Sequence, residues 1–141
     1  MKEAKGSRVI VERFLKGEDV LEQLNKLISQ NRVGAGSFTA LGAVEKATIG
    51  FFMGNGQYST VSVDGPLEVL SCIGNISLKE GAPFVHAHIA LADRTGRTYG
   101  GHLMAGCIVD ATFEVNLQTY EHTELKRSLD PATNLFLLDT R

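Results

Sequence analysis

The feature that most restricts the fold of this chain is a patterned segment, Pro83 to Cys107, that contains three of its four histidines. In the first half of the segment every second position is apolar, and the histidines fall between these residues, which are Val85, Ala87, Ile89 and Leu91. This period of two predicts a β-strand that carries His86 and His88 on one face. A polar loop containing a glycine, residues 93–97, separates this strand from a second extended run. The segment therefore predicts a β-hairpin.

The length of the loop decides the register of the predicted hairpin. If the loop residues make no strand pairs, His88 lies directly opposite His102, with Cβ atoms about 4.5–5.5 Å apart. His86 is then diagonal to His102, and three imidazoles meet on one face. A shift by one residue would turn His102 to the other face, and a β-bulge at Gly100 or Gly101 would have the same effect.

Three imidazoles on one patch suit a divalent metal such as zinc. Neutral imidazole is the commonest metal ligand, and three of them leave one position of a tetrahedral zinc ion open. Gly100 and Gly101 remove side chains beside this site, and Asn75 and Ser77 are placed to line the same pocket. The alternative is three strand histidines with ordinary hydrogen bonds. His122 lies in a polar segment, which predicts a surface position and not a fourth ligand.

Two acids within strand-like runs, Glu68 and Glu114, are the candidates for a catalytic role. A buried acid needs a partner or a metal. Either carboxylate would then orient a ligand histidine or act as a general base on a metal-bound water. The alternative for each is a solvent-facing position. Arg94 and Arg97 in the hairpin loop are candidates for contacts with DNA phosphates, and the alternative for them is a solvated turn.

One amphipathic helix is predicted over about residues 18–33. The acids Glu18 and Asp19 suit the positive end of a helix, and Gly34 and Gly36 are expected to stop it. Its apolar stripe consists of Val20, Leu21, Leu24, Leu27 and Ile28. Such a stripe is expected to pack against a sheet.

The pattern of most of the remaining sequence predicts β-strands. A polar tail over residues 1–7 precedes the first strand, which is expected from Val9 to about Leu15. Further strands are expected at 37–52, 58–63, 67–78, 107–117 and 120–127, with turns at 53–56, 64–66 and 79–81. Asp130-Pro131 is expected to end the last strand, and a second short helix or turn is expected near residues 18–34 or 131–135. The apolar segment 135–138 needs burial in the core or on a neighbouring subunit. The pattern predicts an α+β fold, a single domain over residues 1–141 whose antiparallel-rich strands form one or two packed sheets.

Composition restricts the classes of function. A length of 141 residues suits one substantial core, and a formal net charge of −2 argues against a chain-wide attraction to nucleic acid. No apolar run reaches the roughly 18 residues of a membrane span, and the N-terminus has no apolar signal core, so we expect a cytoplasmic protein. Cys72 and Cys107 are expected to be buried free thiols.

The segment GNISLKEGAPFVHAHIALADRTGRTYGGHLMAGC, residues 74–107, resembles the plants-and-prokaryotes-conserved (PPC) domain in its prokaryotic stand-alone form. The resemblance covers nearly the whole chain, through Arg13, Gly17-Glu18, Gly42-Ala43-Val44, residues 68–71, Val109, Thr112 and Glu114. The HxH and GGH motifs are typical of the prokaryotic branch, whereas plant members lack these histidines and carry AT-hook segments. The resemblance implies a compact α+β fold, a homotrimer, a histidine-bound metal, and a DNA-binding label inherited largely from the plant proteins.

Three classes of function follow from these features. The first is a PPC-domain module, regulatory or ligand-binding, that forms a homotrimer and holds a zinc-like metal at His86, His88 and His102. The second is a metal-dependent hydrolase or lyase, because three histidines, an open coordination position and a nearby glutamate suit zinc chemistry. The third is DNA binding by one face of a trimer. The net charge and the lack of an AT-hook in this chain argue against tight binding.

Overall fold

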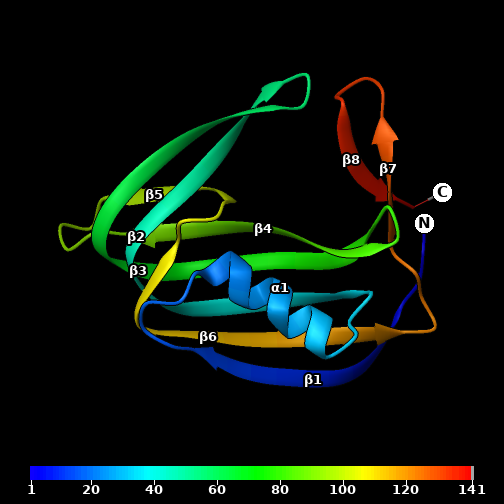
Figure 1. Ribbon diagram of the computed structural model, residues 1–141, viewed down its shortest axis with the longest axis horizontal. Helices are drawn as coiled ribbons and strands as arrows, with labels where there is room; N and C mark the ends of the chain where they lie inside the picture. Colours follow the sequence, from blue (N-terminus) through cyan, green and yellow to red (C-terminus); the bar gives the residue numbers. More distant parts are fainter. Residues whose placement is uncertain (141) are drawn as a thin grey trace.

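A computed structural model describes residues 1–140 as a curved, mainly antiparallel β-structure with one helix on a face of the sheet (Figure 1). The elements are β1 (Lys5–Phe14), α1 (Val20–Gln30), β2 (Gly36–Gly54), β3 (Gln57–Lys79), β4 (Ala82–Ala92), β5 (Thr98–Leu103), β6 (Ile108–Glu121), β7 (Lys126–Asp130) and β8 (Leu135–Asp139). They form one eight-stranded sheet in the order β1-β6-β2-β5-β4-β3-β7-β8. The prediction of antiparallel strands with one main helix is thus confirmed in outline, although the content is mainly β.

The short strand β5 closes part of this sheet into a small barrel. Strands β2, β3, β4 and β5 are hydrogen-bonded in succession, and β5 also pairs with β2. In that last pairing Ile49 lies opposite Leu103, and Gly50 lies opposite His102. The backbone of His102 is therefore held from both sides, by β4 and by β2.

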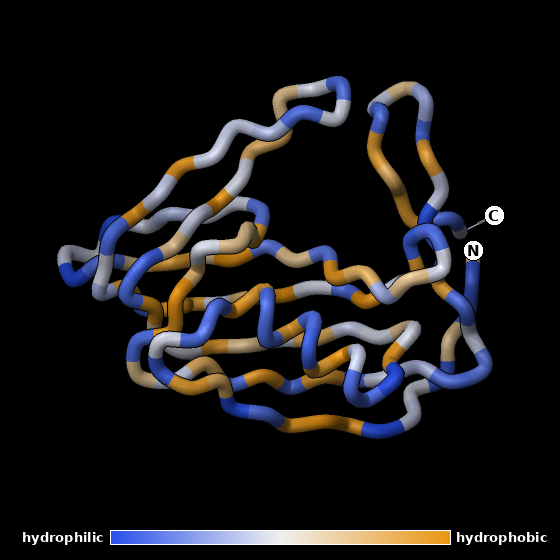
Figure 2. Tube along the Cα trace, viewed as in Figure 1, coloured by the Kyte–Doolittle hydropathy of each residue, from blue (hydrophilic) through white to orange (hydrophobic). Residues whose placement is uncertain are grey.

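The helix α1 covers the inner face of the sheet, and apolar residues alternate with polar ones along most strands (Figures 1 and 2). Its buried residues are Val20, Leu24, Leu27 and Ile28. They join a core that includes four apolar residues of β4, which are Val85, Ala87, Ile89 and Leu91. Among residues 1–140, no helix has the length and apolar character that crossing a membrane requires.

The helix α1 begins where Glu18 and Asp19 predicted its start, but it ends before the predicted end at about residue 33. The Asp19 side chain caps the first turn by accepting a hydrogen bond from the Glu22 N–H at 3.0 Å, and it also accepts one from the Gly106 N–H at 2.6 Å. The helix ends before Asn31, whose N–H donates back to the last turn. Arg32 then takes a left-handed conformation, with φ of 53°, so the glycines that follow do not terminate the helix.

The turn predicted at residues 64–66 does not end a strand. The register between β2 and β3 shifts there, with Val44 opposite Leu67 and Lys46 opposite Asp64. Two residues of β3, one of them Pro66, thus lie opposite one residue of β2. Such a bulge tolerates proline because no ladder hydrogen bond is needed from it. The predicted strands 58–63 and 67–78 are therefore one continuous strand, β3.

The two ends of the chain also differ from the prediction. Residues 5–7 of the expected polar tail already belong to β1, which pairs with β6. The strand expected over residues 120–127 is divided between the end of β6 and the start of β7. The apolar segment 135–138 forms most of β8, which pairs with β7. Leu137 remains 41% exposed, so this segment is only partly buried.

The cysteines behave as predicted. Cys72 and Cys107 are both free and buried. Burial raises the pKa of the Cys72 thiol to about 12 and that of the Cys107 thiol to about 11. Both groups therefore stay protonated at neutral pH, which is typical of unreactive structural cysteines.

Beyond the sheet, the β2–β3 hairpin extends as a curved arm, residues 47–63, toward the β7–β8 hairpin (Figure 1). The N–H of Gly56 at the tip of the arm donates a hydrogen bond of 2.9 Å to the carbonyl of Thr133. The arm contains no charged residue, and Phe51, Phe52 and Met53 on it are exposed. Residues of both hairpins and of β4 line one pocket.

Candidate metal centre

The β4–β5 hairpin has the register that its sequence predicts. His88 pairs with His102, and the ladder continues without a bulge to the loop. The carboxylate of Asp93 holds this loop, since its Oδ1 accepts hydrogen bonds from the Thr95 N–H at 2.8 Å and from the Arg97 N–H at 3.1 Å. Local hydrogen bonds thus keep the loop length on which the position of His102 depends.

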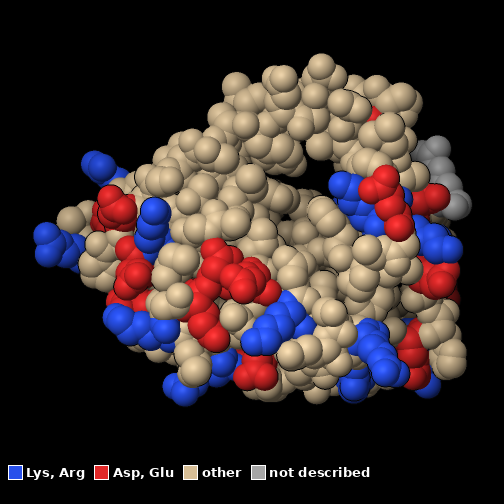
Figure 3. Space-filling view, in the orientation of Figure 1, with Lys and Arg blue, Asp and Glu red and all other residues tan. Residues whose placement is uncertain are grey.

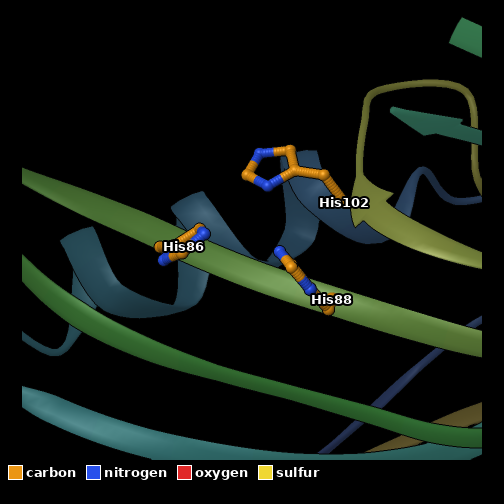
Figure 4. A group of neighbouring side chains, drawn as sticks. All are labelled: His86, His88 and His102. Atoms are coloured by element: carbon orange, nitrogen blue, oxygen red, sulfur yellow. The ribbon is translucent and has the colours of Figure 1, made fainter. Parts of the chain in front are cut away.

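The three histidines of this hairpin converge on one patch, on the face of β4 and β5 that points away from α1 (Figure 4). One ring nitrogen from each of His86, His88 and His102 lies within 4.8 Å of the others. The three ring centroids are 5.2 to 5.5 Å apart. The predicted juxtaposition is present in the structure, and the arrangement supplies three nitrogen donors from two strands.

The surroundings of His86 and His102 favour the neutral form of these two imidazoles. Burial, together with the positive charge of Arg127 and the two neighbouring histidines, lowers the pKa of His86 to about 4. Burial also lowers the pKa of His102, with added effects of His88 and Arg127. Neutral imidazole is the form that binds a metal ion.

One atom of this cluster lacks a partner within residues 1–140. The Nδ1 of His102 is buried and forms no hydrogen bond. Buried polar atoms are nearly always satisfied, and this nitrogen, beside two other imidazoles, is available to bind a metal ion. A divalent ion of zinc type fits this donor set, because zinc accepts three nitrogen ligands and keeps a fourth position open.

The two glycines before His102 serve the packing of β5. A Cβ on Gly101 would lie 2.8 Å from the carbonyl oxygen of Gly50, and one on Gly100 would lie 3.2 Å from that of Ile89. Only glycine allows β5 to fit this closely between its two neighbours. Neither Gly100 nor Gly101 lines the two pockets that touch the histidines.

Arg127 is one of the residues at this site that the sequence did not predict. Its guanidinium donates from Nε to the Ser77 hydroxyl at 2.8 Å, from Nη2 to the Asn75 side-chain oxygen at 2.8 Å, and from Nη1 to the Phe136 carbonyl at 3.0 Å. Asn75 pairs across the sheet with His86. The predicted pocket residues Asn75 and Ser77 thus hold an arginine beside the histidines. No sequence signal marks this contact, because Arg127 is 50 residues from Ser77.

A pocket of about 380 Å³ opens beside the histidines, between the arm, β4 and the β7–β8 hairpin, where Figure 3 shows the surface hollowed. Its polar lining includes His86, His102, Tyr58, Lys79 and Arg127. Its apolar lining consists of Phe84, Leu135, Phe136 and Leu137. A small molecule in this pocket would contact both the histidines and an apolar wall.

The two candidate acids lie away from the histidines. Glu68 is exposed on β3 and pairs with Ala92 at the loop end of the hairpin. Glu114 is exposed on β6 and pairs with Arg13 and Leu41. Neither carboxylate belongs to the group of converging ligand atoms. Neither is the buried acid that a role beside the metal would require.

The other polar candidates are on the surface. Arg94 and Arg97 are exposed in the β4–β5 loop, at the end of the hairpin remote from the histidines. His122 is exposed in the segment between β6 and β7. It takes no part in the histidine cluster.

Comparison with known proteins gives the family of the chain. The family model described as the Plants and Prokaryotes Conserved (PCC) domain matches residues 1–121. The chain belongs to this family. Among solved structures, a PPC protein from Pyrococcus horikoshii is 27% identical with a TM-score of 0.91, covering 100% of this chain and 97% of that protein. The metal-containing protein from Archaeoglobus fulgidus is 31% identical with a TM-score of 0.88, covering 98% and 99%.

A curated protein that is similar to this chain is much longer. The bifunctional protein GlmU from a Synechococcus strain is 34% identical over 127 residues, which are 89% of this chain and 19% of that relative. The chain thus spans about a fifth of the length of the curated relatives it matches.

Proposed function

We propose that this PCC-family chain is a cytoplasmic metal- and ligand-binding module whose His86, His88 and His102 hold a zinc-type ion. The observation that carries the proposal is the convergence of three ring nitrogens within 4.8 Å, one of the imidazoles having a buried Nδ1 without a hydrogen bond. The Archaeoglobus relative is described as metal-containing, which supports a metal in this chain.

The position left open by three histidines favours the binding of a small ligand. A structural zinc site is usually closed by four protein ligands, whereas an open site accepts water or a ligand. A zinc hydrolase or lyase is the alternative, and it would need a general base near the open position. Glu68 and Glu114, the acids expected to serve, are exposed and lie elsewhere on the sheet. The geometry therefore supports ligand binding or regulation better than hydrolysis.

Metal analysis tests the proposal directly. After dialysis against zinc and then against metal-free buffer, purified protein is expected to hold about one zinc ion per chain. His86→Ala removes one ligand and is expected to reduce this content sharply. His122→Asn is the matched control, because it removes an exposed histidine outside the cluster. Equal zinc content in the wild type and in His86→Ala would contradict the proposal.

Exposed apolar surface supports assembly into a homotrimer, as the family resemblance implies. On the face of the sheet opposite α1, Val11 is 75% exposed, Leu41 is 58% exposed, and Leu70 and Ile73 are each 56% exposed. Val11, Leu41 and Leu70 line one shallow depression, so these three side chains lie together. The uncharged arm adds further exposed apolar side chains. A subunit interface would bury these surfaces.

Intrinsic DNA binding, by contrast, is proposed to be weak. Each chain carries a formal charge of −2, so three chains carry about −6. Acidic and basic side chains are interspersed on the face shown in Figure 3, with no continuous basic surface there. Because non-specific affinity comes mainly from basic groups that neutralise phosphates, we expect a Kd no tighter than roughly 10⁻⁶ M at physiological salt.

Fluorescence anisotropy with random and AT-rich duplexes tests this expectation. Arg94→Ala/Arg97→Ala is the variant that would locate any binding at the exposed loop of the hairpin. Tight, sequence-dependent binding that persists at about 0.2 M salt would contradict the proposal and favour a DNA-binding regulator.

A further inference from the structure

The pocket beside the histidines is positively charged. Lys79 and Arg127 line it, whereas none of its lining residues within 1–140 is an aspartate or a glutamate. The charges of these two cations are therefore not balanced inside the pocket. A ligand that fills it would be favoured if it carried negative charge.

Arg127 is held in place without being neutralised. Its three hydrogen-bond acceptors are a hydroxyl, an amide oxygen and a backbone carbonyl, all of them uncharged. Within residues 1–140 it forms no ion pair, although it is half-buried. A guanidinium has five N–H donors, so two remain after these three bonds. Its planar fork matches a carboxylate, and a partly buried charge is stabilised when such an anion pairs with it.

Lys79 adds to the positive charge, and both cations lie against an aromatic wall. Its Nζ lies 4.4 Å from the centroid of the Phe136 ring and 5.5 Å from that of Phe84, and the Arg127 Cζ lies 5.2 Å from the same Phe84 ring. The two rings thus hold both cations at the pocket while leaving their charge available to a ligand.

The remainder of the pocket is apolar. Phe84, Leu135, Phe136 and Leu137 form its wall, and Tyr58 approaches from the arm. Its volume of about 380 Å³ is near the lower end of the range for ligand pockets, about 300–1,000 Å³. These features favour a small organic ion with an apolar body over an inorganic one.

We propose that this pocket binds a small organic carboxylate. Its charged end lies between Arg127 and the histidines, and its apolar body rests on Phe84, Phe136 and Leu137. The inference rests on the ligand-binding role proposed above, and it specifies the chemical class of the ligand.

Isothermal titration calorimetry on the full chain tests this inference with three probes: 3-methylbutanoate, its neutral amide, and inorganic phosphate. The carboxylate is expected to bind with one site per chain and at least about tenfold more tightly than the amide, because only the ion makes a charge-assisted hydrogen bond to the guanidinium. An amide that binds as tightly as the carboxylate would refute the inference. Phosphate that binds more tightly than the carboxylate would also refute it.

Substitutions then locate the binding. Arg127→Gln is expected to weaken carboxylate binding at least about tenfold. Because Arg127 also connects β7 to β3, its substitution affects stability as well as binding. A second variant, at a residue without this role, therefore tests binding separately. Lys79→Gln breaks no side-chain hydrogen bond or ion pair found within residues 1–140 and is expected to weaken binding severalfold. Arg94→Gln, on the exposed loop, is the matched control and should bind like the wild type. Unchanged affinity in Lys79→Gln would place the anion elsewhere and overturn the inference.

The same titrations on zinc-loaded and zinc-free protein separate this inference from the proposed metal site. If the protein holds zinc but no carboxylate binds, the inference fails and the metal site stands. If the carboxylate binds at Arg127 in protein that retains no zinc, the metal proposal fails and the inference stands.

Discussion

Replacing His102 with alanine is expected to remove most of the thermal stabilisation that zinc gives to the folded protein. The backbone of β5 should keep its place, because residue 102 pairs with both His88 and Gly50 through main-chain groups. The substitution loses the packing of a half-buried ring, but it also removes a buried nitrogen without a hydrogen bond. These effects oppose each other, so the zinc-free variant should differ from the wild type by no more than about 1 kcal/mol in free energy of unfolding.

The size of the zinc effect follows from linkage. A ligand that binds only the folded state, at a free concentration of about 100 times its Kd, stabilises that state by about 2.7 kcal/mol. For a chain of 141 residues, each kcal/mol raises Tm by roughly 4 °C, so zinc should raise the wild-type Tm by about 10 °C. Loss of one of three ligands should weaken binding at least about 100-fold. At the same free zinc the stabilisation then falls to about 0.4 kcal/mol, which is about 2 °C.

Differential scanning fluorimetry in zinc-buffered solution measures both shifts. Protein concentration must be the same in all samples, because Tm depends on it if the chains associate. The control is His122→Asn, since His122 has a φ of 54° and asparagine tolerates this left-handed conformation better than most residues. A zinc-induced rise in His102→Ala equal to that of the wild type would refute the argument.

Three further predictions concern stability and assembly. Because the pKa of His86 is lowered to about 4, below the value of 6.5 for an ordinary histidine, the unfolded chain binds a proton between these pH values that the folded chain does not. Urea unfolding of zinc-free protein should therefore show stability falling from pH 6.5 to pH 4, with about 1–2 kcal/mol from His86 after allowance for solvent screening. His86→Asn should reduce this loss, and the remainder is expected from His102, whose pKa burial also lowers. Gly101→Ala places a Cβ 2.8 Å from the carbonyl oxygen of Gly50, and chemical denaturation should show a free energy of unfolding lower by about 1–3 kcal/mol. Gly34→Ala is the control, because its Cβ would lie 3.7 Å from the nearest atom, on Leu78, and should not destabilise the protein. Light scattering should give three times the chain mass of 15.3 kDa, and a monomer at micromolar concentration would disprove the trimer.

Short-range patterns are what the sequence determined by itself. Alternation over residues 85–91 and a polar loop of five residues were enough to predict that His88 faces His102, since both strands and their turn lie within one short segment. Likewise the acids at residues 18 and 19 predicted the start of α1, because a cap acts within a single turn. Where a long-range pairing intervened, the same reasoning failed. Pro66 indicated the end of a strand, but a shift of register against β2 places it in a bulge within β3.

Only the tertiary structure decided what surrounds the histidines. Arg127 reaches the site because β7 pairs in parallel with the end of β3, and such a pairing depends on the path of the whole chain and leaves no local pattern. The same holds for β5, which closes against the far half of β2, and for the tip of the arm, which meets the β7–β8 turn and completes the pocket. The exposure of the two candidate glutamates was also decided by the tertiary structure. Glu68 and Glu114 lie in strands whose faces alternate, and the packing of the helix on the opposite face of the sheet leaves both carboxylates in solvent.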